Sequence, residues 1–158
     1  MVAVTGRWDP AFGALVECFV AEVAAGSERG ALCIMDRGRI VVDIWGGLGA
    51  PDLLWAVDTL ACCFSVTKGV LSLLAHRLID TGVIAPDSRI AALWPAFAAG
   101  GKGAITLHDV LTHRAGLPAV SGAVTPGDLY DWDRMAAHLA ASAPVVPPQA
   151  APVYHNMT

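Results

Sequence analysis

The chain has 158 residues, of which 55% are aliphatic, aromatic or cysteine and 15% are charged, and its formal net charge is −4. This length suits one domain with a sizeable core, and the basic residues are scattered singly, which excludes a nucleic-acid-binding stripe. No run of about 18 uncharged apolar residues occurs, and the first residues lack the pattern of a signal peptide, so we expect a cytoplasmic protein without a membrane span.

The first third of the sequence predicts one helix followed by a β-hairpin. Apolar residues recur at helical spacing over residues 10–25, and Gly26 follows as a stop signal. Two β-prone runs, residues 31–35 and 39–45, flank a turn at 36–38 and predict two antiparallel strands. We therefore expect the chain to open with this helix and to contain two strands. Because two strands do not form a self-sufficient sheet, we expect the fold to be incomplete.

The rest of the sequence predicts helices joined by turns. A Gly- and Pro-containing loop covers residues 46–60, and a long apolar helix follows over residues 65–81. Three shorter helical segments and a Pro-rich connector come next, at residues 87–97, 106–118, 128–144 and 143–152. Thr106 is the expected N-cap of the second of these segments. We divide the chain into residues 1–64, a helix and hairpin, and residues 65–158, a mostly helical part.

The long helix carries one unexpected cation. Its apolar residues cover nearly the whole circumference, which predicts a buried helix, yet Lys68 lies in the first turns, three residues after Ser65. Residues three apart are neighbours on a helix, so the amine can reach the serine hydroxyl. Burial and the positive end of the helix dipole both favour the neutral amine, which can accept a proton from a serine that attacks a carbonyl. The Ser65 N–H would then lie near the developing oxyanion.

A simpler interpretation of this pair stays open at the level of sequence. Lys68 could reach water along its aliphatic stem, and Ser65 could be only the N-cap of the helix.

Cysteine and histidine spacing gives no sign of a disulfide framework or a metal site. The four cysteines form no CxxC pair, and the adjacent Cys62 and Cys63 are poorly placed to bridge each other, so we expect free, buried thiols in a reducing compartment. His108 and His113 are five residues apart and do not share a helical face, which argues against a metal site.

Three segments of the sequence belong together: "SVTK" at 65–68, "LHDVLTHRAGLP" at 107–118 and "YHN" at 154–156. In their order and rough spacing they resemble the penicillin-recognising serine hydrolases, the group of class C β-lactamases, DD-peptidases and family VIII carboxylesterases. The wider sequence is most similar to the family VIII carboxylesterases. The resemblance implies an α/β (α+β) fold of the β-lactamase/DD-peptidase type, with an antiparallel sheet flanked by helices and a mostly helical subdomain, of which this chain is the N-terminal half.

The same resemblance assigns roles to four residues. Ser65 would be the acyl-accepting nucleophile, and Lys68 would accept its proton. Tyr154 would be the second general base, and Asn156 would orient Lys68 and the acyl group. His113, in the middle segment, receives no catalytic role. The reaction would pass through an acyl-enzyme and need no metal or organic cofactor.

The resemblance favours a serine carboxylesterase that acts on small, short-chain acyl esters. A β-lactamase or a D-amino-acid-specific peptidase or amidase is the alternative enzyme, and an inactive binding homologue is the alternative without catalysis. The third sequence element of the group, a Lys-Thr-Gly-like or Trp-Gly-Gly-like triad on a strand, would follow the tyrosine, whereas "WGG" at 45–47 precedes the nucleophile. We therefore expect a second polypeptide that carries the C-terminal half as a partner.

Overall fold

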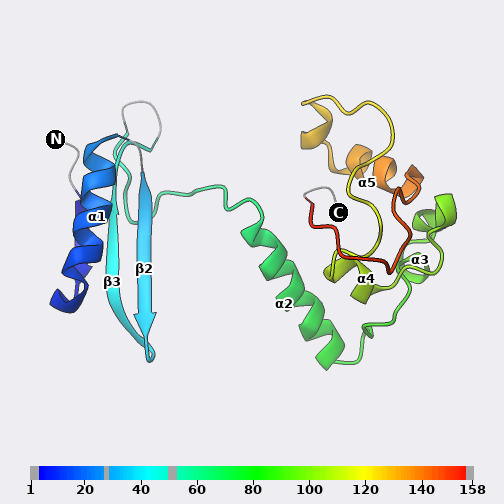
Figure 1. The fold of residues 1–158 in the computed structure, drawn as a ribbon, viewed down its shortest axis with the longest axis horizontal. Helices are drawn as coiled ribbons and strands as arrows, with labels where there is room; N and C mark the ends of the chain where they lie inside the picture. The colour runs from blue at the N-terminus through cyan, green and yellow to red at the C-terminus, as the bar shows by residue number, and fades with distance from the viewer. Residues whose placement is uncertain (1–3, 27–28, 50–52, 156–158) are drawn as a thin grey trace. The chain divides into compact units, whose positions relative to one another are not determined.

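The computed structural model describes residues 4–26, 29–49 and 53–155. The chain divides into two compact units, Met1–Cys62 and Cys63–Thr158, and each is described by itself (Figure 1). The first unit contains β1 (Val4–Trp8), the short 3-10 helix η1 (Pro10–Phe12), α1 (Gly13–Ala24), β2 (Gly30–Asp36) and β3 (Arg39–Gly46). The second unit contains α2 (Val66–Asp80), α3 (Ile90–Leu93), η2 (Pro95–Gly101), α4 (Leu107–Leu111), η3 (Asp128–Tyr130) and α5 (Trp132–Ala141).

The predicted hairpin is confirmed and forms two strands of a three-stranded antiparallel sheet. The strand order is β1-β3-β2, so β3 is the central strand and β1 and β2 are edges among the described residues. Arg37 and Gly38 connect β2 to β3 with φ of 48° and 78°. Two consecutive positive φ values are typical of the two-residue turn whose twist matches a hairpin.

The expectation that the chain opens with a helix is wrong, because β1 precedes it. Gly6 lies in the middle of β1 with φ of 127°, opposite Ile44 of β3, and an added Cβ would overlap the carbonyl oxygen of Asp43. A glycine inside a strand removes a side chain and weakens the local strand signal. Pairing with β3, which no local pattern reveals, decides the conformation of this segment.

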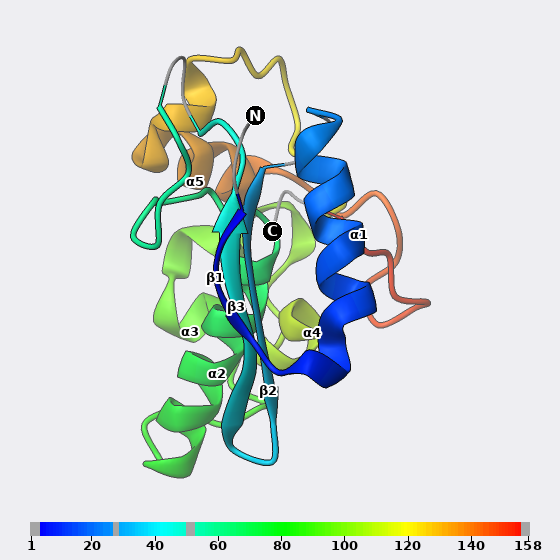
Figure 2. The same cartoon turned by 90° about the vertical axis from the view of Figure 1, so that its left-hand side faces the viewer.

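The core of the first unit lies between α1 and one face of the sheet. Val16 of α1 packs with Val42 and Ile44 of β3, and the two β3 side chains have no exposed surface. Figure 2 shows α1 running alongside the sheet. The helical spacing predicted for residues 10–25 is confirmed over α1, with Pro10 in the preceding 3-10 turn. Apolar residues of the helix therefore cover the central strand, as expected for a helix packed on a sheet.

The core of the second unit is built around the turn that follows α4. Its buried members come from η2, from the segment before α4 and from the turn after it: Phe97, Ile105, Ala115 and Leu117. Partly buried side chains of α3, α4 and α5 pack against this cluster. The helices predicted over residues 87–97, 106–118 and 128–144 are present as shorter elements.

Lys102 is a fully buried cation in this second core, with an exposed fraction of 0%. Its amine donates hydrogen bonds to the carbonyl oxygens of Ala99 at 2.7 Å, Ala140 at 2.9 Å and Ser142. Burial lowers the pKa of Lys102 below its ordinary value. The lysine thus satisfies carbonyl groups that the end of α5 leaves without helical partners and joins that end to η2.

Helix α2 matches the predicted extent but not the predicted burial. None of its residues is buried in the structure. The half-buried positions lie on one stripe at helical spacing, namely Ser65, Lys68, Ser72, Ala75 and Ile79. Apart from Ile79, the larger apolar side chains lie elsewhere on the helix and are exposed; Leu73 keeps 64% of its surface in contact with solvent. A helix that is apolar on every side shows no preferred face in its sequence, so the pattern could not show that this mostly small and polar stripe is the one that is partly covered.

All four cysteines lie in the described part of the chain, where they form no disulfide and are exposed. The expectation of buried thiols is therefore wrong. No helix among the described residues is both long and apolar enough to cross a bilayer.

Candidate active site

Ser65 and Lys68 form the direct contact that their spacing predicts. The Lys68 amine Nζ donates a hydrogen bond to the Ser65 hydroxyl Oγ at 3.2 Å, and both residues are half-buried. Ser65 stands at the N-cap position of α2, but its φ and ψ of −68° and −10° are already helical and its side chain makes no capping hydrogen bond. The hydroxyl therefore does not serve as the cap of the helix and is oriented toward the lysine.

A sharp turn precedes the serine. Phe64 has a φ of 44°, in the left-handed region that residues other than glycine rarely adopt. The first backbone bonds of the helix span three residues, from Val66 N to Cys63 O and from Lys68 N to Ser65 O, both at 3.1 Å. This tight first turn places the serine at the start of the helix, with the lysine one turn further on.

Tyr154 comes from a distant part of the sequence to the same site. The Lys68 Nζ lies 5.7 Å from the centroid of the Tyr154 ring, within the range of a cation–π contact. The structure thus brings Ser65, Lys68 and Tyr154 together within the second unit. Asn156, the fourth predicted site residue, lies outside the described residues.

Tyr154 is carried by a segment without helix or strand that runs beside the turn after α4 (Figure 1). Three backbone hydrogen bonds join the two segments: Val145 N to Gly116 O at 2.9 Å, Gln149 N to Arg114 O at 2.8 Å and Val153 N to His113 O at 2.9 Å. The "THRAGLP" part of the sequence therefore acts as a support for the tyrosine segment.

Asp109 adds a side-chain link between α4 and the same segment. With Thr106 it forms a capping box at the start of α4, which confirms Thr106 as the N-cap, and it accepts a hydrogen bond from Gln149 Nε2 at 3.2 Å. Burial alone would raise the pKa of Asp109, but the hydrogen bonds from the Thr106 backbone and hydroxyl and from Gln149 hold this pKa below its ordinary value. The ionised carboxylate therefore keeps its donors at neutral pH.

Two histidines lie near the tyrosine: His113 contacts its ring, and His155 follows it in the sequence. The His113 ring centroid lies 4.6 Å from that of Tyr154, with 47° between the ring planes, and 5.0 Å from that of His155 in an edge-on arrangement. Burial lowers the pKa of His155, and the nearby His113 and Lys68 lower it further, so His155 is neutral at pH 7. Sequence reasoning gave His113 no role at the site, because its contact with Tyr154 depends on the fold of two distant segments.

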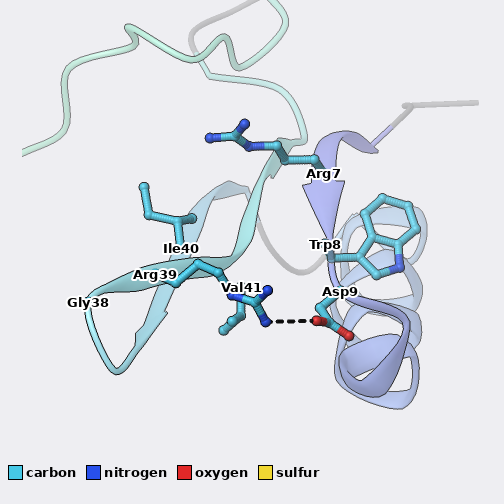
Figure 3. Close-up of a pocket in the computed structure, with 7 residues that line it drawn as sticks. All are labelled: Arg7, Trp8, Asp9, Gly38, Arg39, Ile40 and Val41. Carbon is cyan, nitrogen blue, oxygen red and sulfur yellow. Dashed lines mark hydrogen bonds and ion pairs between the residues drawn. The ribbon is translucent and has the colours of Figure 1, made fainter.

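An open hollow of about 550 Å³ lies in the first unit and contains none of the predicted site residues. It is lined by Arg7, Trp8, Asp9, Gly38, Arg39, Ile40 and Val41. Figure 3 shows the Arg39 guanidinium reaching the Asp9 carboxylate, an ion pair of 3.2 Å between exposed side chains. The two charges satisfy each other at the surface, so this hollow shows no group poised for chemistry.

Comparisons with known proteins agree with the fold. A penicillin-binding protein homologue from Caulobacter crescentus superimposes with a TM-score of 0.84 at 39% identity, over 98% of this chain and 42% of its own. A solved family VIII carboxylesterase gives a TM-score of 0.82 at 38% identity, over 97% and 42% of the two chains. The fold is therefore that of the β-lactamases and penicillin-binding proteins, as the resemblance implied.

The family follows from the sequence match. The model of the Beta-lactamase family matches residues 14–158, and the chain belongs to that family. The esterase/beta-lactamase LipL of Mycobacterium tuberculosis (strain ATCC 25618 / H37Rv) is 40% identical over 145 residues, which are 89% of this chain and 33% of LipL. The chain thus spans about a third of the length of this curated relative.

We predict that Gly116→Ala destabilises the second unit. Gly116 has a φ of 75°, and an added Cβ would overlap the carbonyl oxygen of Val146 in the tyrosine segment. The loss in the free energy of unfolding should be about 2 kcal/mol or more, measured by urea denaturation followed by circular dichroism.

Gly103→Ala is the matched control, because an added Cβ there has nothing within 4 Å. It should change the free energy of unfolding by less than about 0.5 kcal/mol. Equal stabilities of the two variants would show that the glycine does not support the tyrosine segment.

Proposed function

We propose that this chain supplies the nucleophile of a serine hydrolase that cleaves carboxylic esters through an acyl-enzyme on Ser65. The observation that carries the proposal is the 3.2 Å hydrogen bond from Lys68 Nζ to Ser65 Oγ, made by a hydroxyl that does not cap its helix. Serine is a weak nucleophile unless a neighbouring base takes its proton, and this pair has the required reach. Membership of the Beta-lactamase family and the esterase name of LipL support the same chemistry.

In the proposed reaction, Lys68 takes the Ser65 proton as Oγ attacks the ester carbonyl carbon. The carbonyl π electrons move to oxygen and give a tetrahedral intermediate. Its collapse re-forms the carbonyl and breaks the bond to the alcohol oxygen, which leaves with a proton. Water then attacks the acyl-serine in the same way and releases the acid and the free hydroxyl.

Tyr154 is proposed as the second proton carrier, the group that passes a proton to the leaving alcohol. Its support is the approach of Lys68 Nζ to the phenol ring, at 5.7 Å from the centroid. We keep Asn156 as the proposed orienting residue, on the basis of the Tyr-x-Asn sequence alone.

We also propose that a polypeptide carrying the C-terminal half of the fold completes the site. Two features support this: the exposed large apolar side chains of α2, and the edge strand β2, whose outer side has no partner strand among the described residues. Exposed apolar patches and open strand edges are surfaces that proteins ordinarily cover. The intact mass of the purified active sample should show a second polypeptide or a longer chain; full activity of the 158 residues alone would overturn this proposal.

Covalent labelling by a fluorophosphonate probe tests whether Ser65 is the nucleophile. The probe should attach to Ser65, Ser65→Ala should abolish the adduct, and Lys68→Ala should slow labelling by about 100-fold or more, because a general base contributes this much to a proton transfer. Peptide mapping and the time course of labelling measure both effects.

Ser72→Ala is the matched control, since Ser72 lies on the same half-buried stripe of α2 without a lysine three residues later. It should label like the wild type. An adduct that persists in Ser65→Ala, or unchanged labelling in Lys68→Ala, would contradict the proposed site.

Substrate preference separates the ester reaction from its alternatives. The LipL name and the penicillin-binding protein homologue keep a β-lactamase or a D-amino-acid-specific peptidase as the second candidate. Short-chain p-nitrophenyl esters should give a higher kcat/KM than nitrocefin or D-alanyl peptides. The reverse order would favour the second candidate, and the absence of any fluorophosphonate adduct would favour a binding homologue.

A further inference from the structure

We propose that His113 is a positioning residue that holds Tyr154 beside Lys68. The inference deepens the proposed function, since Tyr154 is there the second proton carrier of the Ser65 site.

His113 holds the tyrosine segment at two points. Its ring packs against the Tyr154 ring at 4.6 Å between centroids, and its backbone carbonyl oxygen accepts the N–H of Val153 at 2.9 Å. One contact fixes the side chain and the other fixes the backbone of the preceding residue. Together they restrict both the path of the chain and the direction of the phenol.

Tyr154 needs such a support because little else encloses it. Its side chain belongs to a segment without helix or strand, and the residue keeps 66% of its surface exposed. An exposed side chain loses conformational entropy when it is held in one rotamer. The ring of His113 lowers this cost by contact on one side, while Lys68 Nζ lies 5.7 Å from the ring centroid.

His113 is itself held in place by its own helix. It follows α4 with a φ of 57°, and its N–H donates to the Val110 carbonyl oxygen at 3.1 Å. Histidine and asparagine enter the left-handed region more readily than most residues other than glycine. Because α4 is anchored by the capping box of Thr106 and Asp109, His113 offers the tyrosine a fixed surface.

The imidazole acts through ring contact rather than through a polar anchor. Its Nδ1 is buried and has no hydrogen-bond partner in the part of the chain that the structure describes. The ring contacts the rings of both Tyr154 and His155. A ring of similar shape should therefore replace it, whereas a small polar side chain should not.

Two variants of His113 separate ring contact from backbone conformation. His113→Phe keeps a planar ring but tolerates the left-handed backbone less well, and His113→Asn tolerates that backbone but removes the ring. If the ring positions Tyr154, His113→Asn should lower kcat for the ester about 10- to 100-fold with little change in KM, because small displacements of a reacting group have costs of this size. His113→Phe should stay within about threefold of the wild type. The reverse order would show a purely backbone role and overturn the inference.

A double-mutant cycle with Tyr154→Phe tests whether the effect passes through the tyrosine. If it does, His113→Asn should cause no further loss of kcat in the Tyr154→Phe background. Additive losses would contradict the inference. Thermal unfolding of each variant identifies losses that come from a destabilised fold.

Nuclear magnetic resonance tests the contact without depending on activity. The sequence has two tyrosines, and Tyr130 is 93% exposed, so it is an internal reference for an unsupported ring. We expect a nuclear Overhauser effect between the rings of His113 and Tyr154 that is lost in His113→Asn. If the wild type shows no such effect, the inference about His113 is wrong. If the effect is present but the fluorophosphonate does not label the protein, the proposed function is wrong while the ring contact stands.

Discussion

The hydrogen bond between Lys68 and Ser65 is the interaction on which the proposed chemistry depends. This contact is local and does not depend on tertiary packing. A helix brings residues three apart within reach of each other, and the tight turn at Phe64 starts that helix at the serine. The surrounding structure partly buries the two side chains. The stripe of α2 that begins with these two residues is its half-buried face, so the amine and the hydroxyl are partly withdrawn from water.

The tyrosine is positioned differently, by three backbone hydrogen bonds between two segments without helix or strand. Gly116, Arg114 and His113 each offer a carbonyl oxygen to the segment that leads to Tyr154. The supporting turn is itself fixed by α4 and by the Asp109 carboxylate, which reaches Gln149 of the other segment. The site therefore combines a local element, the start of a helix, with a support assembled from distant parts of the sequence.

Much of this arrangement could be predicted from the sequence where local patterns decide the structure. Helical spacing marked α1 and α2, turn residues marked the hairpin, and the Ser-x-x-Lys spacing predicted the contact that the structure shows. Sequence patterns did not predict the structure where contacts with distant residues determine it. Gly6 weakens the sequence signal of β1, a strand that forms because it pairs with β3. Helix α2 is apolar on all sides, so its sequence does not show that the mostly small and polar stripe is the partly covered face. The contact of His113 with Tyr154 could not be predicted, since a left-handed backbone at a non-glycine residue and a pairing between irregular segments leave no periodic signal.

A crystal structure of the protein after reaction with a fluorophosphonate tests the proposed site most directly. We expect continuous density from Ser65 Oγ to phosphorus, with Lys68 Nζ within hydrogen-bonding distance of that Oγ and the Tyr154 ring still packed on His113. Density on another residue, or a Lys68 side chain that points away from the phosphonylated Ser65, would contradict the proposed site.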